Sequence, residues 1–271
     1  INTLTVGQFD ELNKCEKEDA LNSNFVFHQP NLDIESKETS AKFIPIPTIV
    51  FRGFHPDMTY VRSGGGIVHF PIIGNYCSAI CFAAYKLGYS EEETFSFYNK
   101  QVFSNLDYYS IYQSSFSELL AEGQSCGLDL SNFFKKWERL GIFMHTINHP
   151  KIEILCDIAR LLVNQTDLSI MIQNAHEFIP DALVLKGAWS VYPEIAENYG
   201  LKGAYGFKGP ANRVLNLKEL IYISFLTYSK YQKDELSIRY YSTSQSKEFD
   251  LDLYKKTFAH QISSNKCCQR F

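Results

Sequence analysis

The stretch "YCSAICFAAYKLGYSEEE" (76–93) decides the fold class of this chain. Residues 78–87 are almost wholly apolar, and Gly88 follows them as a helix stop. "SEEE" (90–93) is typical of a capping box, in which a serine and a glutamate three positions later satisfy free N–H groups at a helix start. We therefore expect a buried helix over 78–87 and a second helix from Ser90 to about residue 103.

Helical patterns continue toward the C-terminus and strand patterns lie toward the N-terminus. The most periodic stretch begins at Pro150, where Ile152, Leu155, Cys156, Ala159, Leu162 and Val163 fall on one stripe. Strand-like runs lie at 24–30 and 44–51, and in the second of these two prolines restrict pairing to 48–51. The sequence predicts a mixed α/β, predominantly helical protein, with further helices at 109–122, 131–140, 215–231 and 250–262.

Composition excludes several classes of protein. A chain of 271 residues that is 45% hydrophobic and 21% charged is long enough for a large core and ordinary for a soluble globular protein. A net charge of −4 gives no attraction to nucleic acid. No run approaches the roughly 18 apolar residues of a transmembrane segment, and the start does not resemble a secretion signal.

The cysteines and the first residue bear on compartment and completeness. Seven cysteines are an odd number and lack the spacing of a disulfide framework or a zinc site, so we expect reduced thiols and a cytoplasmic protein. The first residue is Ile1 and not Met, which suggests an excised domain or a truncated sequence.

"FMHTINHPK" (143–151) has three possible meanings. The i, i+4 spacing of His145 and His149 is that of a metalloprotease helix, but that motif needs an intervening glutamate, and Pro150 belongs at a helix start and not inside one. We therefore expect no metal and place both histidines before the helix, with Asn148 or His149 as its cap. This turn is either an acid–base or oxyanion site, or only the start of a core helix.

Two loops offer further polar clusters. "FRGFHPDMTYVRSGGG" (51–66) follows a strand, as functional loops often do, and its triple glycine indicates a tight turn or, weakly, a phosphate loop. "GLKGAYGFKGPANRVLNLK" (200–218) has recurring glycines and four cations that we expect to face no acidic residue, either as a site for a phosphorylated ligand or as a solvated turn. The Gly-x-Ser-x-Gly elbow, the Walker loop and the dinucleotide turn are all missing.

These pieces, in this order, resemble the WcbI family of polysaccharide-biosynthesis proteins. The matching stretches are "FHQP" (27–30), "PTIVFRGFHPDMTYV" (47–61), "YCSAICFAAYKLGYSEEE" (76–93), "FMHTINHPKIEILCDIARLL" (143–162) and "IPDALVLKGAWSVYPEIAENYGLKGAYGFK" (179–208). One feature departs from the family pattern, which opens with a strand and a Gly-Asn-Cys-Gln-like turn. "GNYC" (74–77) has similar letters but corresponds to a later family segment, so we expect that an upstream strand and turn are missing.

The resemblance implies one domain over 1–271, with a small α/β part at about 1–75 and a cradle-like helical part at about 76–271. It also implies a bacterial, cytoplasmic O-acetyltransferase, at the inner face of the membrane, that moves an acetyl group from acetyl-CoA to a sugar of a capsular or surface polysaccharide. The implied partners are a saccharide acceptor and other capsule-assembly proteins, with coenzyme A as co-substrate and no metal.

In this context the candidate residues take definite roles. A base must accept the proton of the sugar hydroxyl, and a neutral histidine can do this near pH 7. We expect His149 or His55 as the base, Asp57 as the residue that orients it, and Asn148 as a polar donor. The expected cofactor contacts are Arg52, Arg62, Lys202, Lys208, Tyr76 and Ser78, and the expected sugar contacts are Trp189 and Tyr192.

Three alternatives remain at this level. The chain could be a non-catalytic glycan- or nucleotide-sugar-binding module of a larger capsule-assembly protein, which would suit its aromatic side chains. It could be a hydrolase of acyl groups, although the serine elbow is missing. It could also be a transferase for another phosphorylated donor, because the basic loop would bind any such molecule.

Overall fold

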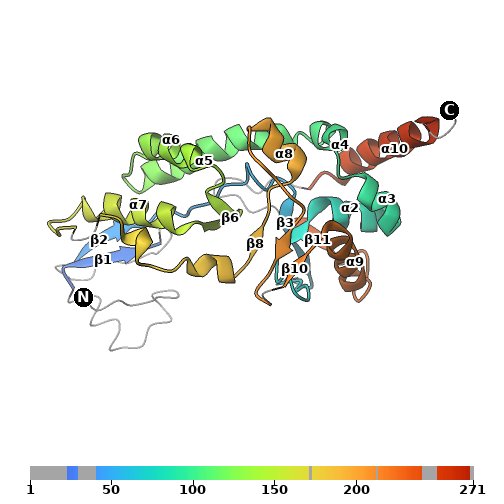
Figure 1. The fold of residues 1–271 in the computed structure, drawn as a ribbon. Coiled ribbons are helices and arrows are strands. Elements are labelled where there is room, and N and C mark those ends of the chain that lie inside the picture. Colours follow the sequence, from blue (N-terminus) through green and yellow to red (C-terminus); the bar gives the residue numbers. More distant parts are fainter. Residues whose placement is uncertain (1–22, 30–40, 171–172, 212, 240–248, 269–271) are drawn as a thin grey trace.

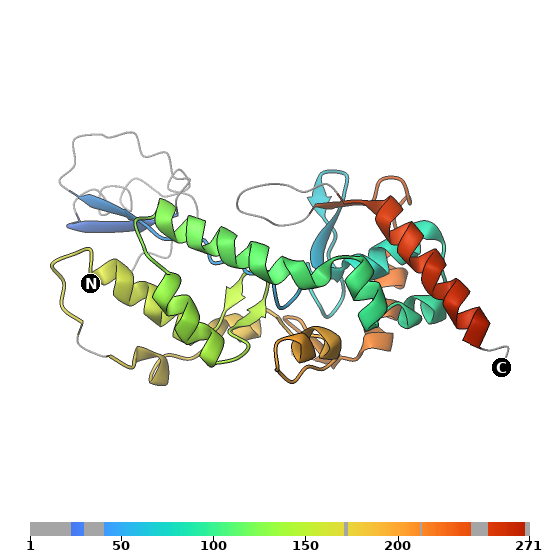
Figure 2. The same ribbon diagram turned by 90° about the horizontal axis from the view of Figure 1, so that it is seen from above.

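The structure of this chain, a computed structural model, describes residues 23–29, 41–170, 173–211, 213–239 and 249–268. These residues form an elongated molecule with β1 and β2 near one end and α9 and α10 at the other (Figure 1; Figure 2). Helix accounts for 46% of the structure and strand for 15%, which confirms the prediction of a mixed α/β, predominantly helical fold.

Short sheets are distributed along the molecule. β1 pairs with β2 in parallel, β3 is the centre of a sheet with β4, β5 and β11, and β9 lies between β8 and β10. β6 and β7 form an antiparallel hairpin. The bounds are β1 Phe25–His28, β2 Lys42–Pro45, β3 Met58–Ser63, β4 Gly66–Ile67, β5 Cys77–Ser78, β6 Met144–Thr146, β7 His149–Pro150, β8 Ala188–Trp189, β9 Phe207–Lys208, β10 Val214–Leu215 and β11 Ser237–Arg239.

Helices cover these sheets. α2 packs against α9 and α10, and α3 also contacts α9. The bounds are α2 Ala79–Leu87, α3 Glu91–Ser96, α4 Lys100–Asn105, η2 Tyr108–Ser110, α5 Ile111–Ser125, α6 Ser131–Arg139, α7 Ile152–Val163, η3 Ala175–Glu177, η4 Ala182–Leu185, α8 Pro193–Asn198, α9 Leu217–Tyr228 and α10 Leu251–Cys268.

The helix stop and the capping box predicted from residues 76–93 are present, and the first helix begins at Ala79, one residue later than expected. Ser78 caps α2 by accepting a hydrogen bond from Cys81 N, and Gly88 ends the helix with φ of 82°. Ser90 and Glu93 form the expected capping box of α3. The predicted continuation to residue 103 is wrong, because α3 ends at Ser96 and the Asn99 side chain accepts from Val102 N to begin a separate helix, α4.

Two other predictions are corrected by the structure. In the 44–51 stretch the paired strand is β2, which ends at Pro45, and not 48–51; Phe51 N instead donates to Ile147 O over 2.8 Å. In α7 the stripe predicted to be buried includes Ala159, which is exposed, whereas Asp157 is buried. The buried face of α7 therefore differs from the predicted stripe and includes Asp157, because side chains of α6 and α7 donate hydrogen bonds to its buried carboxylate.

An aromatic cluster joins the loop after Val50 to the β6–β7 hairpin. The Phe51 ring lies 4.9 Å from that of Phe143, and Phe54 lies 5.0 Å from the same ring. All three side chains are at most 2% exposed. Because aromatic pairs at this separation add to the energy of burial, they hold residues 51–57 against the hairpin that contains Asn148 and His149.

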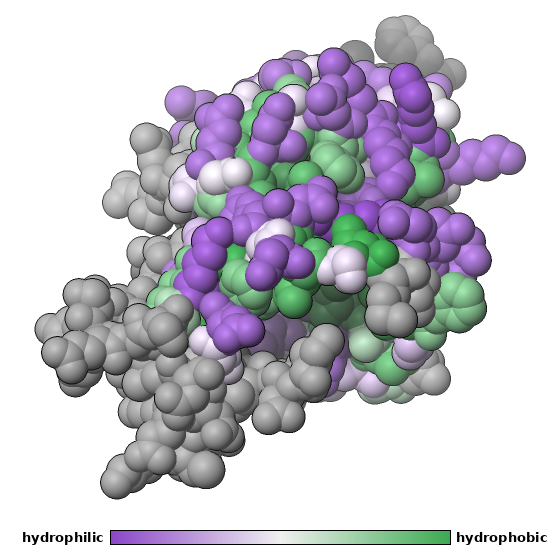
Figure 3. Space-filling view, turned by 90° about the vertical axis from the view of Figure 1, so that its left-hand side faces the viewer, coloured by the Kyte–Doolittle hydropathy of each residue, from purple (hydrophilic) through white to green (hydrophobic). Residues whose placement is uncertain are grey.

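The surface is mixed in character. At the end of the molecule seen in Figure 3, hydrophilic side chains dominate and smaller hydrophobic areas lie between them. Among the described residues Phe178 is the most exposed large apolar side chain, and Leu185, seven positions later, is also exposed. None of the helices within the described ranges combines the length and the apolar character needed to cross a lipid bilayer.

Candidate active site

Three segments far apart in the sequence meet around the β6–β7 hairpin. Thr146 pairs with His149 across the hairpin, so Asn148 lies in its tight turn. Tyr76, directly before β5, reaches the turn from one side. Gly187, directly before β8, approaches from another and presents its carbonyl oxygen to His149.

The Tyr76 hydroxyl is the centre of the cluster. It donates to Asn148 Oδ1 over 2.6 Å and lies 3.1 Å from His149 Nε2. Thr146 Oγ1 donates to the same hydroxyl over 3.2 Å, and Asn148 Nδ2 donates to Tyr60 Oη over 3.3 Å. We call Tyr76, Asn148 and His149 the histidine cluster.

The bonding of His149 defines which ring nitrogen is free to accept a proton. Nδ1 lies 3.4 Å from Gly187 O, and because a carbonyl oxygen only accepts, we assign the ring hydrogen to Nδ1. The Tyr76 hydroxyl has one hydrogen, and the shorter contact assigns it to Asn148. With this assignment His149 Nε2 keeps its lone pair, and the 3.1 Å contact between Nε2 and the Tyr76 oxygen becomes a hydrogen bond only when Nε2 gains a proton.

The electrostatics favour a neutral ring. Burial lowers the pKa of His149 below its ordinary value of 6.5; the bond to Gly187 opposes this, and the nearby His145 lowers the pKa further. The ring is neutral near pH 7 and has a lone pair for a substrate proton. Once protonated, it would direct both N–H groups at oxygen atoms, those of Gly187 and Tyr76, so the arrangement suits a general base.

A second histidine of the hairpin forms a pair that the sequence did not reveal. His145 Nε2 lies 2.7 Å from Asp181 Oδ2, and their side chains are 13% and 22% exposed. The same oxygen accepts from Ile152 N, the first residue of α7, over 3.2 Å. Burial raises the pKa of Asp181, but the bond and charge of His145 and two backbone bonds outweigh it and lower the pKa overall.

The predicted cap of α7 is wrong. The helix begins at Ile152, with Lys151 as its cap residue, and neither Asn148 nor His149 caps it. Pro150 lies in β7, where it pairs with Met144, and this pairing keeps residues 149–150 extended. The placement of both histidines before the helix is confirmed.

His55 and Asp57 do not form the pair that their spacing suggested. His55 is 5% exposed, and its Nε2 donates to Trp189 O over 2.8 Å. Asp57 accepts from Ile80 N and from the hydroxyls of Tyr108 and Tyr192. The prediction that Asp57 orients a histidine is therefore wrong, and the buried His55 is badly placed for a base that must reach a substrate.

The buried His55 leads us to expect that the free energy of unfolding depends on pH. Burial, against the opposing bond to Trp189 O, lowers its pKa from 6.5 to about 4. Between these two pH values the unfolded chain binds a proton that the folded chain does not, so the free energy of unfolding falls as the pH falls, by about 3 kcal/mol in all. Urea unfolding of the wild type and of His55→Gln from pH 7.5 to 4.5 measures this.

Two variants serve as comparisons in the urea-unfolding series. His55→Gln should show a flatter dependence on pH whatever its stability at pH 7.5, and His260→Gln, at an exposed position of α10, should follow the wild type. Equal pH slopes for the wild type and His55→Gln would contradict the assignment.

The predicted cofactor cations lie on different elements. Arg52 Nη2 donates to Pro56 O, Arg62 Nη1 to Gly65 O and Lys208 Nζ to Val184 O, while Lys202 is exposed. Lys208 is the one tied to the histidine cluster through the backbone, because it pairs with Ala188 of β8, the residue after Gly187. Contact of these four residues with a cofactor stays a prediction.

Two glycines of residues 200–218 allow close packing of the backbone. A Cβ on Gly209 would overlap Ile72 O, and one on Gly203 would lie 2.5 Å from Val191 O. Arg213 was expected to face no acidic residue, but it forms a 2.7 Å ion pair with Glu219. In the other loop Gly64 and Gly65 have φ of 56° and 84°, as the tight-turn interpretation requires.

Three residues predicted to contact a ligand have buried side chains. Ser78 is fully buried, caps α2 and lies 2.6 Å from the Tyr98 hydroxyl. Trp189 is 3% exposed with its ring 4.8 Å from Phe207, and Tyr192 is 5% exposed with its hydroxyl bound to Asp57. Their side chains are engaged with other parts of the protein, and contact of Ser78 with a cofactor and of both aromatic rings with a sugar stays a prediction.

The sequence missed residues that complete the site. Thr146 is on the hairpin itself, and its spacing from His149 was the available signal. Gly187 acts through its carbonyl oxygen, and Asp181 lies 36 positions from His145, so neither leaves a local pattern.

Comparison with known proteins agrees with this architecture. The family model described as polysaccharide biosynthesis enzyme WcbI matches residues 34–170, just over half of the chain. The fold is similar to a solved structure of WcbI, described as a novel polysaccharide biosynthesis enzyme in its native form without a disulfide bond between coenzyme A and one of its cysteines. That similarity has a TM-score of 0.60 at 12% identity and covers 95% of this chain and 84% of the other. Comparison with curated proteins gave no significant match. The chain belongs to the WcbI family of polysaccharide biosynthesis enzymes.

Proposed function

We propose that this chain is an O-acetyltransferase that moves an acetyl group from acetyl-CoA to a saccharide hydroxyl during capsular or surface polysaccharide biosynthesis. The observation that carries the proposal is the histidine cluster, in which His149 is neutral, partly buried and held by Gly187 O with its Nε2 lone pair unprotonated. The solved WcbI structure is described with coenzyme A, which supports the choice of donor.

The residues of the cluster would divide the work. His149 Nε2 takes the proton of the acceptor hydroxyl as its oxygen bonds to the acetyl carbon. Hydrogen bonds to Tyr76 and Tyr60 hold the Asn148 side chain in the turn of the hairpin. There an amide N–H can stabilise the developing oxyanion. The carbon–sulfur bond then breaks, and His149 returns the proton to the departing thiolate.

The donor side has a smaller set of supporting residues. Acetyl-CoA supplies the acetyl group as a thioester and brings phosphates that need cations. Lys208 fits this need: it lies on the strand beside Gly187, and its bond to Val184 O is one that a phosphate oxygen can replace. Arg52, Arg62 and Lys202 remain candidates for the other phosphates.

Calorimetry with coenzyme A tests the donor. The wild type should bind, and Lys208→Ala should bind about 10–100-fold more weakly, because a hydrogen bond to a charged group contributes about 1.5–3 kcal/mol. Lys218→Ala is a matched control, since Lys218 is on α9 and its ammonium group lies over the Phe95 ring of α3. If binding of coenzyme A to the wild type cannot be measured, the proposal that acetyl-CoA is the donor is wrong. That result would favour another phosphorylated donor or a non-catalytic binding module.

Product analysis tests the reaction. Mass spectrometry should find an acetylated saccharide only when acetyl-CoA and the acceptor are both present. Release of coenzyme A with free acetate and no acetylated sugar would instead show a hydrolase.

A further inference from the structure

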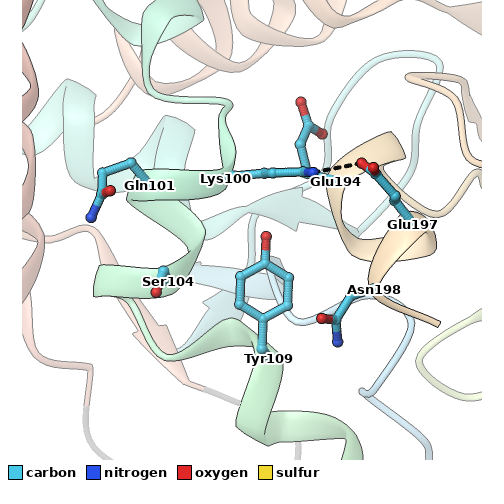
Figure 4. Close-up of a pocket in the computed structure, with 7 residues that line it drawn as sticks. All are labelled: Lys100, Gln101, Ser104, Tyr109, Glu194, Glu197 and Asn198. Atoms are coloured by element: carbon cyan, nitrogen blue, oxygen red, sulfur yellow. Dashed lines mark ion pairs between the residues drawn. The ribbon is translucent and has the colours of Figure 1, made fainter.

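A polar pocket lies away from the histidine cluster, between α4 and α8 (Figure 4). Its volume of about 580 Å³ is within the roughly 300–1,000 Å³ that ligand sites usually have. One wall is Lys100, Gln101 and Ser104 of α4, and the other is Glu194, Glu197 and Asn198 of α8. Tyr109 lies between the two walls.

The lining presents both donors and acceptors over an aromatic ring. Asn198 carries an amide and Ser104 and Tyr109 carry hydroxyls, while the Gln101 amide donates to Asn105 Oδ1 over 3.0 Å. The Tyr109 hydroxyl points toward the Lys100 side chain in Figure 4. This mixture fits a ligand whose own groups are hydroxyls, each both a donor and an acceptor, and whose ring has an apolar face.

Charge narrows the class of ligand. The pocket holds one cation, Lys100, against the two carboxylates of Glu194 and Glu197. The cation is already engaged by Glu197 over 2.7 Å. Phosphates and uronic acids would meet a net negative lining, so a coenzyme A phosphate does not suit this pocket and an uncharged polyol does.

One carboxylate is held in place from below. Glu194 Oε2 accepts from the Tyr205 hydroxyl over 2.7 Å, which leaves Oε1 for a ligand. The Tyr205 ring lies 5.0 Å from that of Tyr192, whose hydroxyl is bound to the buried Asp57. Hydrogen bonds and ring contacts of these two tyrosines therefore fix the position of Glu194. The side chains of the Lys100–Glu197 pair are 61% and 68% exposed, so this ion pair contributes little to stability.

We propose that this pocket binds a neutral pyranose unit of the acceptor saccharide, with Glu194, Glu197 and the Asn198 amide on its hydroxyls and Tyr109 against its ring face. The inference rests on the proposed function in naming the acceptor as the source of that sugar. It adds a binding site separate from the residues that would carry out the transfer.

The test is protein-observed NMR without coenzyme A. The probes are the methyl glycosides of glucose, galactose, mannose and N-acetylglucosamine, with sodium glucuronate and inorganic phosphate as anionic comparisons. At least one neutral glycoside should shift the amide signals of Lys100, Ser104 and Asn198, and neither anion should. Ser104→Tyr, which fills the pocket from an exposed helix position, should weaken that binding at least tenfold, and Glu197→Gln should also weaken it.

The control is Glu92→Gln, an exposed glutamate on α3 outside the pocket, which should bind as the wild type does. The inference is overturned if no neutral glycoside shifts these signals, if the anions shift them as strongly, or if Ser104→Tyr binds equally well. Because the experiment contains no acetyl donor, such a failure leaves acetyl transfer by the histidine cluster intact. Failure to bind coenzyme A would likewise leave this sugar site intact.

Discussion

Replacing His149 by glutamine is expected to lower kcat for acetyl transfer by about 10²–10⁴-fold, the usual contribution of a positioned general base. Glutamine can still form a hydrogen bond with Tyr76, but its amide does not accept a proton near neutral pH. The Nε2 lone pair stays unprotonated in the resting site, because Gly187 O accepts the hydrogen bond from Nδ1 and the Tyr76 hydroxyl donates to Asn148. Binding of coenzyme A should stay close to that of the wild type.

The pH profile gives an independent reading of the same group. Burial lowers the pKa of His149, so kcat/KM should rise with pH through a midpoint below 6.5 and then level off. His69→Gln, at an exposed position bound to Asn75, should leave both rate and profile unchanged. If His149→Gln keeps turnover within about threefold of the wild type, the base is another group, and the His145–Asp181 pair becomes the first candidate.

Local signals predicted the helices and one part of the site. The stop at Gly88 and the capping box of Ser90 and Glu93 depend on residues within four positions of each other, and both appeared where expected. The Asn-His-Pro turn likewise placed Asn148 and His149 outside the helix. What the turn could not indicate is that Pro150 pairs in a hairpin, because the partner strand β6 has no distinctive pattern of its own.

Pairs of polar residues close in sequence were a poor guide to pairs in space. His55 and Asp57 are two positions apart, yet His55 bonds to Trp189 O and Asp57 to tyrosines 51 and 135 positions away. Both side chains are buried, and each is bound by partners that come from distant parts of the chain. The real carboxylate partner of a histidine, Asp181, comes from a loop whose position depends on how η4 meets β7, a contact that no local pattern encodes.

Of the substitutions considered, we expect removal of the Asp157 carboxylate to lower the free energy of unfolding the most. Its carboxylate is 1% exposed and accepts from Lys136 Nζ over 2.8 Å, Arg160 Nη1 over 2.6 Å and Trp137 Nε1 over 2.9 Å. Asp157→Ala leaves the buried Trp137 N–H and the mostly buried Arg160 without this acceptor. Breaking a buried ion pair costs about 3–5 kcal/mol, and we expect about 3 kcal/mol, because the Lys136 side chain is 53% exposed and can turn to water.

Urea unfolding at pH 7.5 measures that loss, and two further variants divide it between charge and hydrogen bonding. Asp157→Asn keeps an oxygen that can accept from Trp137 while removing the charge, so its loss should be smaller than that of Asp157→Ala. Lys135→Ala, beside Lys136 on α6 but pointing to solvent, should change the free energy of unfolding by less than about 0.5 kcal/mol. An Asp157→Ala protein that unfolds within about 1 kcal/mol of the wild type would mean that the cost of burying the charge cancels its bonds, in which case α7 is held to α6 by apolar packing alone.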